Sequence, residues 1–339
     1  MRVAVIGAGS MGGKHAQLLA GLPDVNEVLV VDAVRSRAES VARDVGGRAL
    51  GHDAALDAAD AVVIATPAHL HAATVDATIA RGIPALCEKP LTDDASASAA
   101  LVERVEGAGA HVEVGFQRRH DPAYAAARAI VSDGRAGRVH LLRLTAFDPR
   151  VTPRAITDWP SGDTAPVFLH SSIHDFDFVR WMSGQEVVEV TAEGSHRDGS
   201  RPEDARGIES AVVTMRCSEG TLAVLEATWL HPLGYDNRVE LVGDELHLTM
   251  GLSPRTPATH IDWDGAASSP WGGYLERFET AYRNELIAFV AAARGERPPS
   301  STARDGLEAH RIAIAATRAY VERRPVRLDE VSTAEREVA

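Results

Sequence analysis

The sequence predicts an α/β protein of two domains, a doubly wound parallel sheet followed by an α+β domain with a large, mostly antiparallel open sheet. Its 339 residues are a length typical of two domains. Over residues 1–118, short apolar runs alternate with amphipathic helical patterns, which favours parallel βαβ units. Over residues 119–330, most extended runs form one block between helices, which favours an antiparallel sheet.

In the first domain, each short apolar run is expected to be a buried strand and each amphipathic stretch a helix. Right-handed crossovers between successive parallel strands then give the doubly wound arrangement. The expected strands are Arg2–Ile6, Glu27–Val31, Ala61–Ala65, Pro84–Cys87 and His111–Gly115, and the expected helices are Ser10–Leu22, Arg35–Val45, His69–Arg81 and Asp94–Gly107.

In the second domain, the same reasoning predicts helices at both ends and strands between them. Helices are expected over Pro122–Ser132, Phe168–Met182, Tyr274–Arg294 and Ala303–Glu322, with a proline-containing loop over Asp148–Pro166 and a loop-rich region over Ser253–Gly273. Strands are expected at Arg138–Phe147, Val187–Glu193, Ile208–Arg216, Leu222–Leu230, Arg238–Val242 and Leu246–Met250. Residues 331–339 are expected to be a frayed tail.

The composition excludes several functional classes. A formal net charge of −13 argues against a nucleic acid or an anionic membrane surface as partner. No apolar run approaches the ~20 residues that cross a bilayer, and the chain opens on a strand without a secretory leader pattern, so we expect a cytoplasmic protein. The two cysteines, Cys87 and Cys217, are expected to be buried free thiols.

A glycine-rich turn directly follows the first strand and opens the first helix. Gly7 permits the tight turn, Gly9 lets the backbone approach a pyrophosphate, and Gly12 permits close packing of helix and strand. The first helical turn, with Ser10 and Met11, offers N–H groups to the phosphates. This pattern in its strand–turn–helix context predicts a Rossmann domain that binds a dinucleotide.

An acidic residue at the end of the second strand indicates which dinucleotide is bound. Asp32 follows Gly12 by about 20 residues, where a carboxylate binds the ribose hydroxyls of NAD and repels the 2′-phosphate of NADP. Arg35 and Arg37 lie just beyond and could instead bind that phosphate. We interpret both arginines as a solvated helical turn, so NAD is predicted in preference to NADP.

Further polar residues follow the later strands at the carboxyl edge of the sheet, where such sheets bind ligands. Thr66, Pro67 and His71 come after the fourth strand, and we expect them to contact the cofactor. Glu88 and Lys89 come directly after the fifth strand and are also placed at the cofactor. Lys89 is one of only two lysines in the chain, which suggests a role that arginine cannot fill, such as relaying a proton. A salt bridge that only fixes the loop is the alternative.

The combined motifs closely resemble the Gfo/Idh/MocA oxidoreductases over most of the chain. The first-half motifs are Gly7–Gly12 with His15, Asp32, Ala65–Pro67 with His71, Glu88–Pro90 and Gly115–Tyr124. The second-half motifs are Ser171–Asp177, Phe278–Phe289 and Asp305–His310. The resemblance implies a homodimer or homotetramer formed through the C-terminal sheet. It also implies an NAD-dependent hydride transfer to or from a secondary alcohol of a sugar, cyclitol or related polyol.

The same resemblance identifies the catalytic candidates. His174 matches the family's general base, and Lys89 matches the lysine that holds and acidifies the substrate hydroxyl. At His170 the inositol dehydrogenase branch has an aspartate, so an imidazole replaces a carboxylate one helical turn before His174, and an inositol substrate does not carry over directly. The two histidines have the spacing of metal ligands, but no third ligand is evident and no metal is predicted.

Three other residues are candidates for substrate binding, namely Arg119, Asp148 and Tyr235, although each could equally be structural. Two other functions remain open at this point. One is a regulator of the same fold that binds NAD without turnover. The other is an NAD-recycling sugar hydrolase or lyase, which oxidises its substrate transiently. Retention of Lys89 and His174 favours the dehydrogenase over the regulator.

Overall fold

The structure is a computed structural model that describes residues 1–150, 164–201, 203–251, 253–255, 259–263 and 265–331. Contacts divide the chain into two compact units. The first contains Met1–His120 and Ala281–Glu308, and the second contains Asp121–Thr280 and the described part of Ala309–Ser332. The sequence predicts two domains that are each continuous in the chain. In the structure, the segment Ala281–Glu308 belongs to the first unit instead of the second.

The first unit contains a six-stranded sheet with the order β3-β2-β1-β4-β5-β6, in which every pairing is parallel. This order is that of the doubly wound dinucleotide-binding fold, and it confirms the predicted class. The strands are β1 (Arg2–Ile6), β2 (Glu27–Val31), β3 (Arg48–Ala49), β4 (Ala61–Ile64), β5 (Ala85–Cys87) and β6 (Val112–Val114). The helices are α1 (Ser10–Ala20), α2 (Arg35–Val45), α3 (His52–Ala58), α4 (His71–Ile79) and α5 (Ala95–Gly107).

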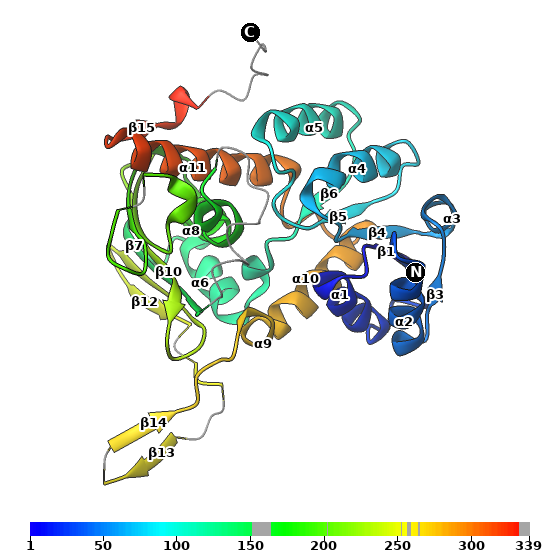
Figure 1. Ribbon diagram of the computed structural model, residues 1–339, viewed down its shortest axis with the longest axis horizontal. Helices are drawn as coiled ribbons and strands as arrows, with labels where there is room; N and C mark the ends of the chain where they lie inside the picture. Colours follow the sequence, from blue (N-terminus) through cyan, green and yellow to red (C-terminus); the bar gives the residue numbers. More distant parts are fainter. Residues whose placement is uncertain (151–163, 202, 252, 256–258, 264, 332–339) are drawn as a thin grey trace. The chain divides into compact units, whose positions relative to one another are not determined.

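The helices cover both faces of this sheet. One face packs against α1, α2 and α10 (Glu279–Ala293), and Leu286, Phe289 and Val290 of α10 join the same apolar cluster as Val3 and Val5. On the other face, α4 and α5 lie side by side (Figure 1). Asp94 caps the N-terminus of α5, and its carboxylate accepts a hydrogen bond from the N–H of Ala97.

The second unit is built on a seven-stranded sheet with the order β12-β11-β7-β10-β9-β8-β15. Only the β7–β10 pairing is parallel, which confirms a mostly antiparallel sheet. The strands are β7 (Val139–Pro149), β8 (Val187–Ser195), β9 (Ser210–Cys217), β10 (Leu222–His231), β11 (Asp236–Gly243), β12 (His247–Met250) and β15 (Val326–Arg327). Helices α6 (Pro122–Ser132) and α8 (Ile173–Ser183) lie on the same face, together with the part of α11 (Ala303–Glu322) that belongs to this unit (Figure 1).

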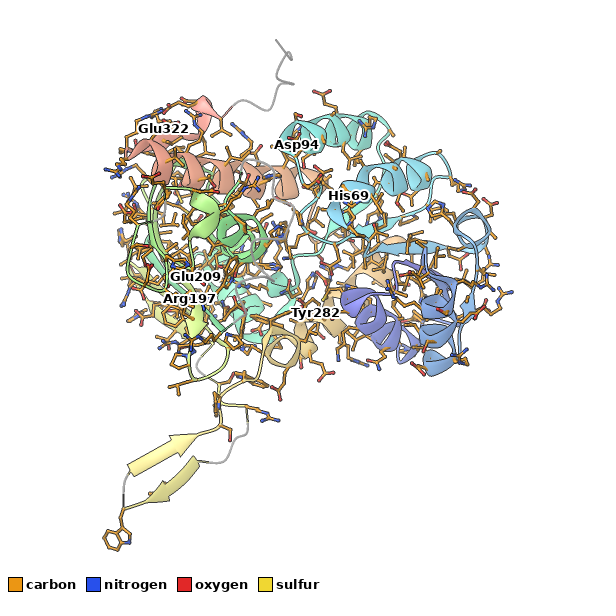
Figure 2. The ribbon with its side chains drawn as sticks, in the orientation of Figure 1. His69, Asp94, Arg197, Glu209, Tyr282 and Glu322 are labelled. Carbon is orange, nitrogen blue, oxygen red and sulfur yellow. The ribbon has the colours of Figure 1, made fainter. Side chains whose placement is uncertain are left out.

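An ion pair closes the connection between β8 and β9. Glu209 is buried and accepts hydrogen bonds from the backbone N–H of Arg197 at 2.8 Å and from its Nε at 3.0 Å. Figure 2 shows the two side chains next to one another. Because the guanidinium compensates the charge of a carboxylate that the fold buries, the pair secures this turn of the chain.

Three predicted elements of the second half differ from the structure. The single helix expected over Phe168–Met182 is a π-helical turn, Val167–Ser171, followed by α8. The helix expected over Tyr274–Arg294 is interrupted at Phe278, which separates α9 (Tyr274–Arg277) from α10. The loop-rich region contains a hairpin of β13 (Thr259–Asp262) and β14 (Gly265–Ser268) that extends away from the sheet of this unit (Figure 1). Residues 151–163 of the predicted loop and residues 332–339 of the predicted tail lie outside the described residues.

Both cysteines are buried free thiols, as predicted. Burial raises the pKa of Cys87 well above its usual value and that of Cys217 to about 11, so neither is a thiolate near neutral pH. No helix among the described residues has both the length and the apolar character needed to cross a membrane.

The position of α10 in the first unit makes a testable prediction. Phe289 is fully buried in the apolar cluster, so Phe289→Ala should lower the free energy of unfolding by about 3–5 kcal/mol. Ile287 of the same helix is 41% exposed, and Ile287→Ala should cost below about 1 kcal/mol. Urea titration measures both. A cost for Phe289→Ala no larger than that for the control would contradict the packing of α10 against this sheet.

Candidate functional site

The glycine-rich turn lies between β1 and α1, as predicted, and the surroundings of each glycine differ. Gly7 has a φ of +98°, and a Cβ there would lie 2.5 Å from the carbonyl oxygen of Ala65. A Cβ at Gly12 would lie 1.8 Å from the carbonyl oxygen of Gly7. A Cβ at Gly9 would meet no atom within 4 Å. Gly7 and Gly12 are thus required by the fold itself, whereas Gly9 borders space at the N-terminus of α1 that a ligand's phosphates could use.

Asp32 follows β2 and is fixed by the backbone around it. Its Oδ2 accepts a hydrogen bond from the N–H of Ala8, within the glycine-rich turn, and its Oδ1 accepts one from the N–H of Val34, both at 2.8 Å. Burial alone would raise the pKa of Asp32, but these two bonds and the Arg37 guanidinium 3.4 Å away hold it below its usual value. A carboxylate has about four lone-pair sites. The two backbone N–H groups take one on each oxygen, and Arg37 makes only long contacts, at 3.4 and 3.5 Å, so ribose hydroxyls that displaced Arg37 could take the other two.

The two arginines that follow have different surroundings. Arg35 is 65% exposed and pairs with Glu39 one helical turn later, as expected of a solvated helix. Arg37 instead contacts Asp32, a pairing the sequence analysis did not predict.

His71 connects two loops at the carboxyl edge of the sheet. Its buried ring lies with Nε2 2.8 Å from the carbonyl oxygen of Thr66 and Nδ1 3.0 Å from that of Pro90. Burial lowers the pKa of His71, while these carbonyls and the charge of Glu88 oppose that shift. A neutral ring has one N–H and donates to one of these carbonyls, whereas a protonated ring would donate to both and join the loop after β4 to the loop after β5. Pro67, next to Thr66, is exposed.

Two observations at this edge fit a nucleotide cofactor. One is the open space at Gly9 described above. The other is the side-chain hydroxyl of Thr66, a buried oxygen that has no hydrogen-bond partner among the described residues. A buried polar atom usually has a partner, and a ligand bound between the glycine-rich turn and this loop would supply one.

Glu88 and Lys89 directly follow β5, as predicted. Glu88 is buried, and its Oε1 lies 2.7 Å from Nε2 of His15 on α1. Its Oε2 accepts a hydrogen bond from the backbone N–H of Lys89 at 3.3 Å. The Lys89–Pro90 peptide bond is cis. His15 belongs to the motif that includes Gly7–Gly12, but its contact with Glu88 is not apparent from the sequence.

In the second unit, the two candidate histidines occupy different helical segments. His170 lies in the π-helical turn, which the bond from the N–H of Ser172 to the carbonyl of Val167 closes, and His174 lies in the first turn of α8. The regular α-helical relation assumed between them is therefore wrong, because the wider turn changes the angle between successive residues. Both side chains are half-buried. Whether they face one substrate stays a prediction.

The three other substrate candidates also have defined surroundings. Asp148 lies near the end of β7 and accepts a hydrogen bond from the Ser171 hydroxyl at 3.0 Å, which ties this strand to the π-helical turn. Arg119 donates to the carbonyl oxygen of Ser300 at 2.8 Å and pairs with Asp305, so much of its guanidinium is engaged within the first unit. Tyr235 connects β10 to β11, is buried, and packs edge-on against Phe278. Among the described residues, no group of three or more His, Cys, Asp or Glu side chains could hold a metal ion.

Comparison with known proteins matches both halves of the chain to domains of one oxidoreductase family. Residues 1–116 match a family model described as an oxidoreductase family with an NAD-binding Rossmann fold, and residues 124–249 match the GFO/IDH/MocA C-terminal domain. The chain is 35% identical over 323 residues to myo-inositol dehydrogenase Hyg17 of Streptomyces leeuwenhoekii, covering 94% of this chain and 97% of that protein.

Two further proteins extend the comparison. The chain is 30% identical to scyllo-inositol 2-dehydrogenase (NAD(+)) of Bacillus subtilis strain 168, covering 97% of this chain and 96% of that protein. The crystal structure of scyllo-inositol dehydrogenase from Lactobacillus casei, with bound NAD(H) and scyllo-inositol, superposes with a TM-score of 0.88 at 25% identity. That superposition covers 97% of this chain and 99% of the other.

The different surroundings of two glycines predict different outcomes for the same substitution. Gly9→Ala should leave the midpoint of thermal unfolding unchanged but weaken NADH binding about tenfold or more, because the methyl group would enter space that the pyrophosphate needs. Gly12→Ala should instead lower the unfolding midpoint, because its methyl group collides with the Gly7 carbonyl. Thermal unfolding and NADH fluorescence titration measure the two effects. Unchanged NADH affinity in Gly9→Ala would show that the pyrophosphate does not bind there.

Proposed function

Because the chain belongs to the GFO/IDH/MocA family of NAD-binding oxidoreductases, we propose that it oxidises a secondary alcohol of a cyclitol, sugar or related polyol to a ketone, or catalyses the reverse. The observation that carries the proposal is the 94% of the chain that aligns with an inositol dehydrogenase. A cyclitol is the substrate class these relatives favour, since the Lactobacillus casei crystal structure contains bound NAD(H) and scyllo-inositol.

The cofactor-binding residues of the proposal all follow strands of the first unit. Gly7, Gly9 and Gly12, with Ser10 and Met11, would hold the pyrophosphate. Asp32 would bind the adenosine ribose and make NAD preferred over NADP. Thr66, Pro67 and His71 would contact the cofactor from the next loop, and Glu88 and Lys89 would lie nearest the nicotinamide. The fixed carboxylate of Asp32 and the buried hydroxyl of Thr66 support these assignments.

The chain's own catalytic task is to manage the proton of the substrate hydroxyl. When bound, NAD⁺ accepts the hydride that leaves the carbinol carbon. The hydroxyl proton must leave as the carbon–oxygen double bond forms, and we assign its removal to the imidazole of His174. Lys89 would donate a hydrogen bond to the same oxygen and so favour its deprotonation.

His170 is assigned to substrate orientation, as are Arg119, Asp148 and Tyr235. An imidazole at position 170 offers one donor and one acceptor, whereas an aspartate there would offer acceptors only. This exchange is expected to change which hydroxyl pattern is accepted. The contacts of Arg119 with Ser300 and Asp305, and the burial of Tyr235, make these two the weaker substrate candidates.

The C-terminal sheet is the proposed site of self-association. Helices α6 and α8 lie against one face of it, and the other face presents Val212 on β9 and Leu222 on β10, which are 47% and 41% exposed. A second copy of the chain, as a dimer or tetramer, would cover these apolar side chains. We also propose that the protein is cytoplasmic and has neither a nucleic acid nor a membrane as partner.

The proposed reaction predicts substrate-dependent reduction of NAD⁺. Inositols, sugars and sugar acids would be screened with NAD⁺ and with NADP⁺ by NADH or NADPH absorbance. At least one cyclitol or sugar should support multiple turnovers, with a higher kcat/KM for NAD⁺, because Asp32 repels a 2′-phosphate. Preference for NADP⁺ would show that Arg37, and not Asp32, determines which dinucleotide the site prefers. NADH binding without any turnover would favour the regulator, and polyol conversion without net NADH would favour the hydrolase or lyase.

The proton assignment predicts separable effects for the two histidines. His174→Ala should lower kcat by about 10²–10⁴-fold, because the base is lost. His170→Ala should mainly raise KM, since its proposed role is orientation. Both effects would be measured as pH–rate profiles on the substrate found above. If His170→Ala removes the titration that His174→Ala leaves intact, the two roles are reversed. Loss of activity with a chelator and its return with zinc would contradict the metal-free assignment.

A further inference from the structure

Glu88 is held in place by groups from several elements of the first unit. The side chain of His15 is fully buried, and its Nε2 lies 2.7 Å from Oε1 of Glu88, whose side chain is 11% exposed. Because an ionised carboxylate only accepts hydrogen bonds, Nε2 of His15 carries the hydrogen. A Cβ at Gly115, just after β6, would lie 3.2 Å from Oε2 of Glu88, so the carboxylate also rests against that backbone.

His15 itself has little freedom to move. It lies on α1, one turn after the residues assigned to the pyrophosphate, and Tyr282 of α10 packs edge-on against its ring with centroids 6.0 Å apart. Figure 2 labels Tyr282 on this helix. The Nδ1 of His15 is buried with no hydrogen-bond partner among the described residues, so its contact with Glu88 is the polar contact that orients the ring.

The charges around Glu88 favour an ionised carboxylate. Burial raises its pKa, but the hydrogen bond and charge of His15, together with the charges of Lys89 and His71, bring the pKa below its usual value. The pKa of Glu285 on α10, whose charge interacts with that of Glu88, is shifted in the opposite direction. Burial and the charges of Glu88 and Glu113 raise the pKa of Glu285 well above its usual value, so its surroundings disfavour the ionised form.

We propose that His15 is a positioning residue for the reaction, which acts through Glu88 to fix the backbone of Lys89. Glu88 receives a hydrogen bond from His15 on one oxygen and from the Lys89 N–H on the other. Helix α1 would thereby couple the turn that binds the pyrophosphate to the loop that carries the catalytic lysine. The inference rests on the proposed function where it is tested by turnover. The NMR test described below does not depend on that function.

Without His15, Glu88 would lose the hydrogen bond that favours its ionised form. Its pKa would rise, so that the carboxyl would hold a proton at pH values where the native residue does not. A protonated Glu88 accepts the Lys89 N–H bond less well, and Lys89 would be misplaced. Protonation of His174 already contributes to the acid limb of the kcat profile, and a titration of Glu88 would add to it, so the limb should move to higher pH. The value of kcat should also fall by about 10–100-fold while NADH affinity stays within about threefold.

The test compares two amides at position 15. His15→Gln places an N–H₂ group near the original Nε2 and should retain the native kcat and acid limb. His15→Asn is one methylene shorter, cannot reach Glu88, and should show the loss and the shift. Glu285→Gln is the matched control, because it keeps the size of a buried side chain of α10 and leaves the contact between His15 and Glu88 intact, and it should leave the acid limb in place. Equal profiles for Gln and Asn, or the same shift in the control, would overturn the proposal.

The scarcity of lysine supplies a readout that needs no turnover. In a Lys14→Arg background, Lys89 is the only lysine, and isotope-labelled reductive methylation gives one lysine signal in the NMR spectrum. With NADH bound, that signal should be displaced by His15→Asn and restored by His15→Gln. An unmoved signal in His15→Asn overturns the proposal. If His15→Asn does not fold, the proposal is tested on His15→Gln alone, and a displaced signal in that variant overturns it. A displaced and restored signal in a protein that oxidises no polyol would support the positioning and contradict the proposed function.

Discussion

The parallel pairing of four strands is the constraint on which the candidate site depends. Ile6 of β1 is in register with Val31 of β2 and with Ile64 of β4, and Ile64 is in register with Cys87 of β5. The residue after each strand end therefore begins a loop at the same edge of the sheet. Gly7, Asp32, Ala65 and Glu88 occupy those positions, although they lie far apart in the sequence.

Hydrogen bonds between these loops keep the edge in one conformation. The N–H of Ala8 donates to Asp32, His71 lies between the carbonyls of Thr66 and Pro90, and His15 pairs with Glu88. Each contact satisfies a buried or half-buried polar group and also joins the loop after one strand to the loop or helix that follows another. A site that must hold a dinucleotide and a polyol hydroxyl in fixed geometry benefits from such rigidity.

Much of this architecture could be predicted from local patterns, and the exceptions have physical reasons. The motifs at Gly7–Gly12, Asp32 and Glu88–Lys89 could be recognised because each directly follows an apolar run that the sequence marks as a strand. Strand β3 and helix α3 were missed because they are too short to show a period. The π-helical turn before α8 was missed because its apolar pattern resembles that of an α-helix. The packing of α10 in the first unit, and the contact of His15 with Glu88, arise from long-range contacts that no local pattern encodes.

Transfer of an isotope from substrate to cofactor tests the central claim most directly. A polyol that the protein accepts would be deuterated at its reacting carbon and mixed with NAD⁺ in a single turnover, and the NADH formed would be analysed by mass spectrometry. Direct hydride transfer predicts NADH that carries the deuterium, formed more slowly than from unlabelled substrate. Unlabelled NADH, or deuterium released into the solvent, would contradict the account.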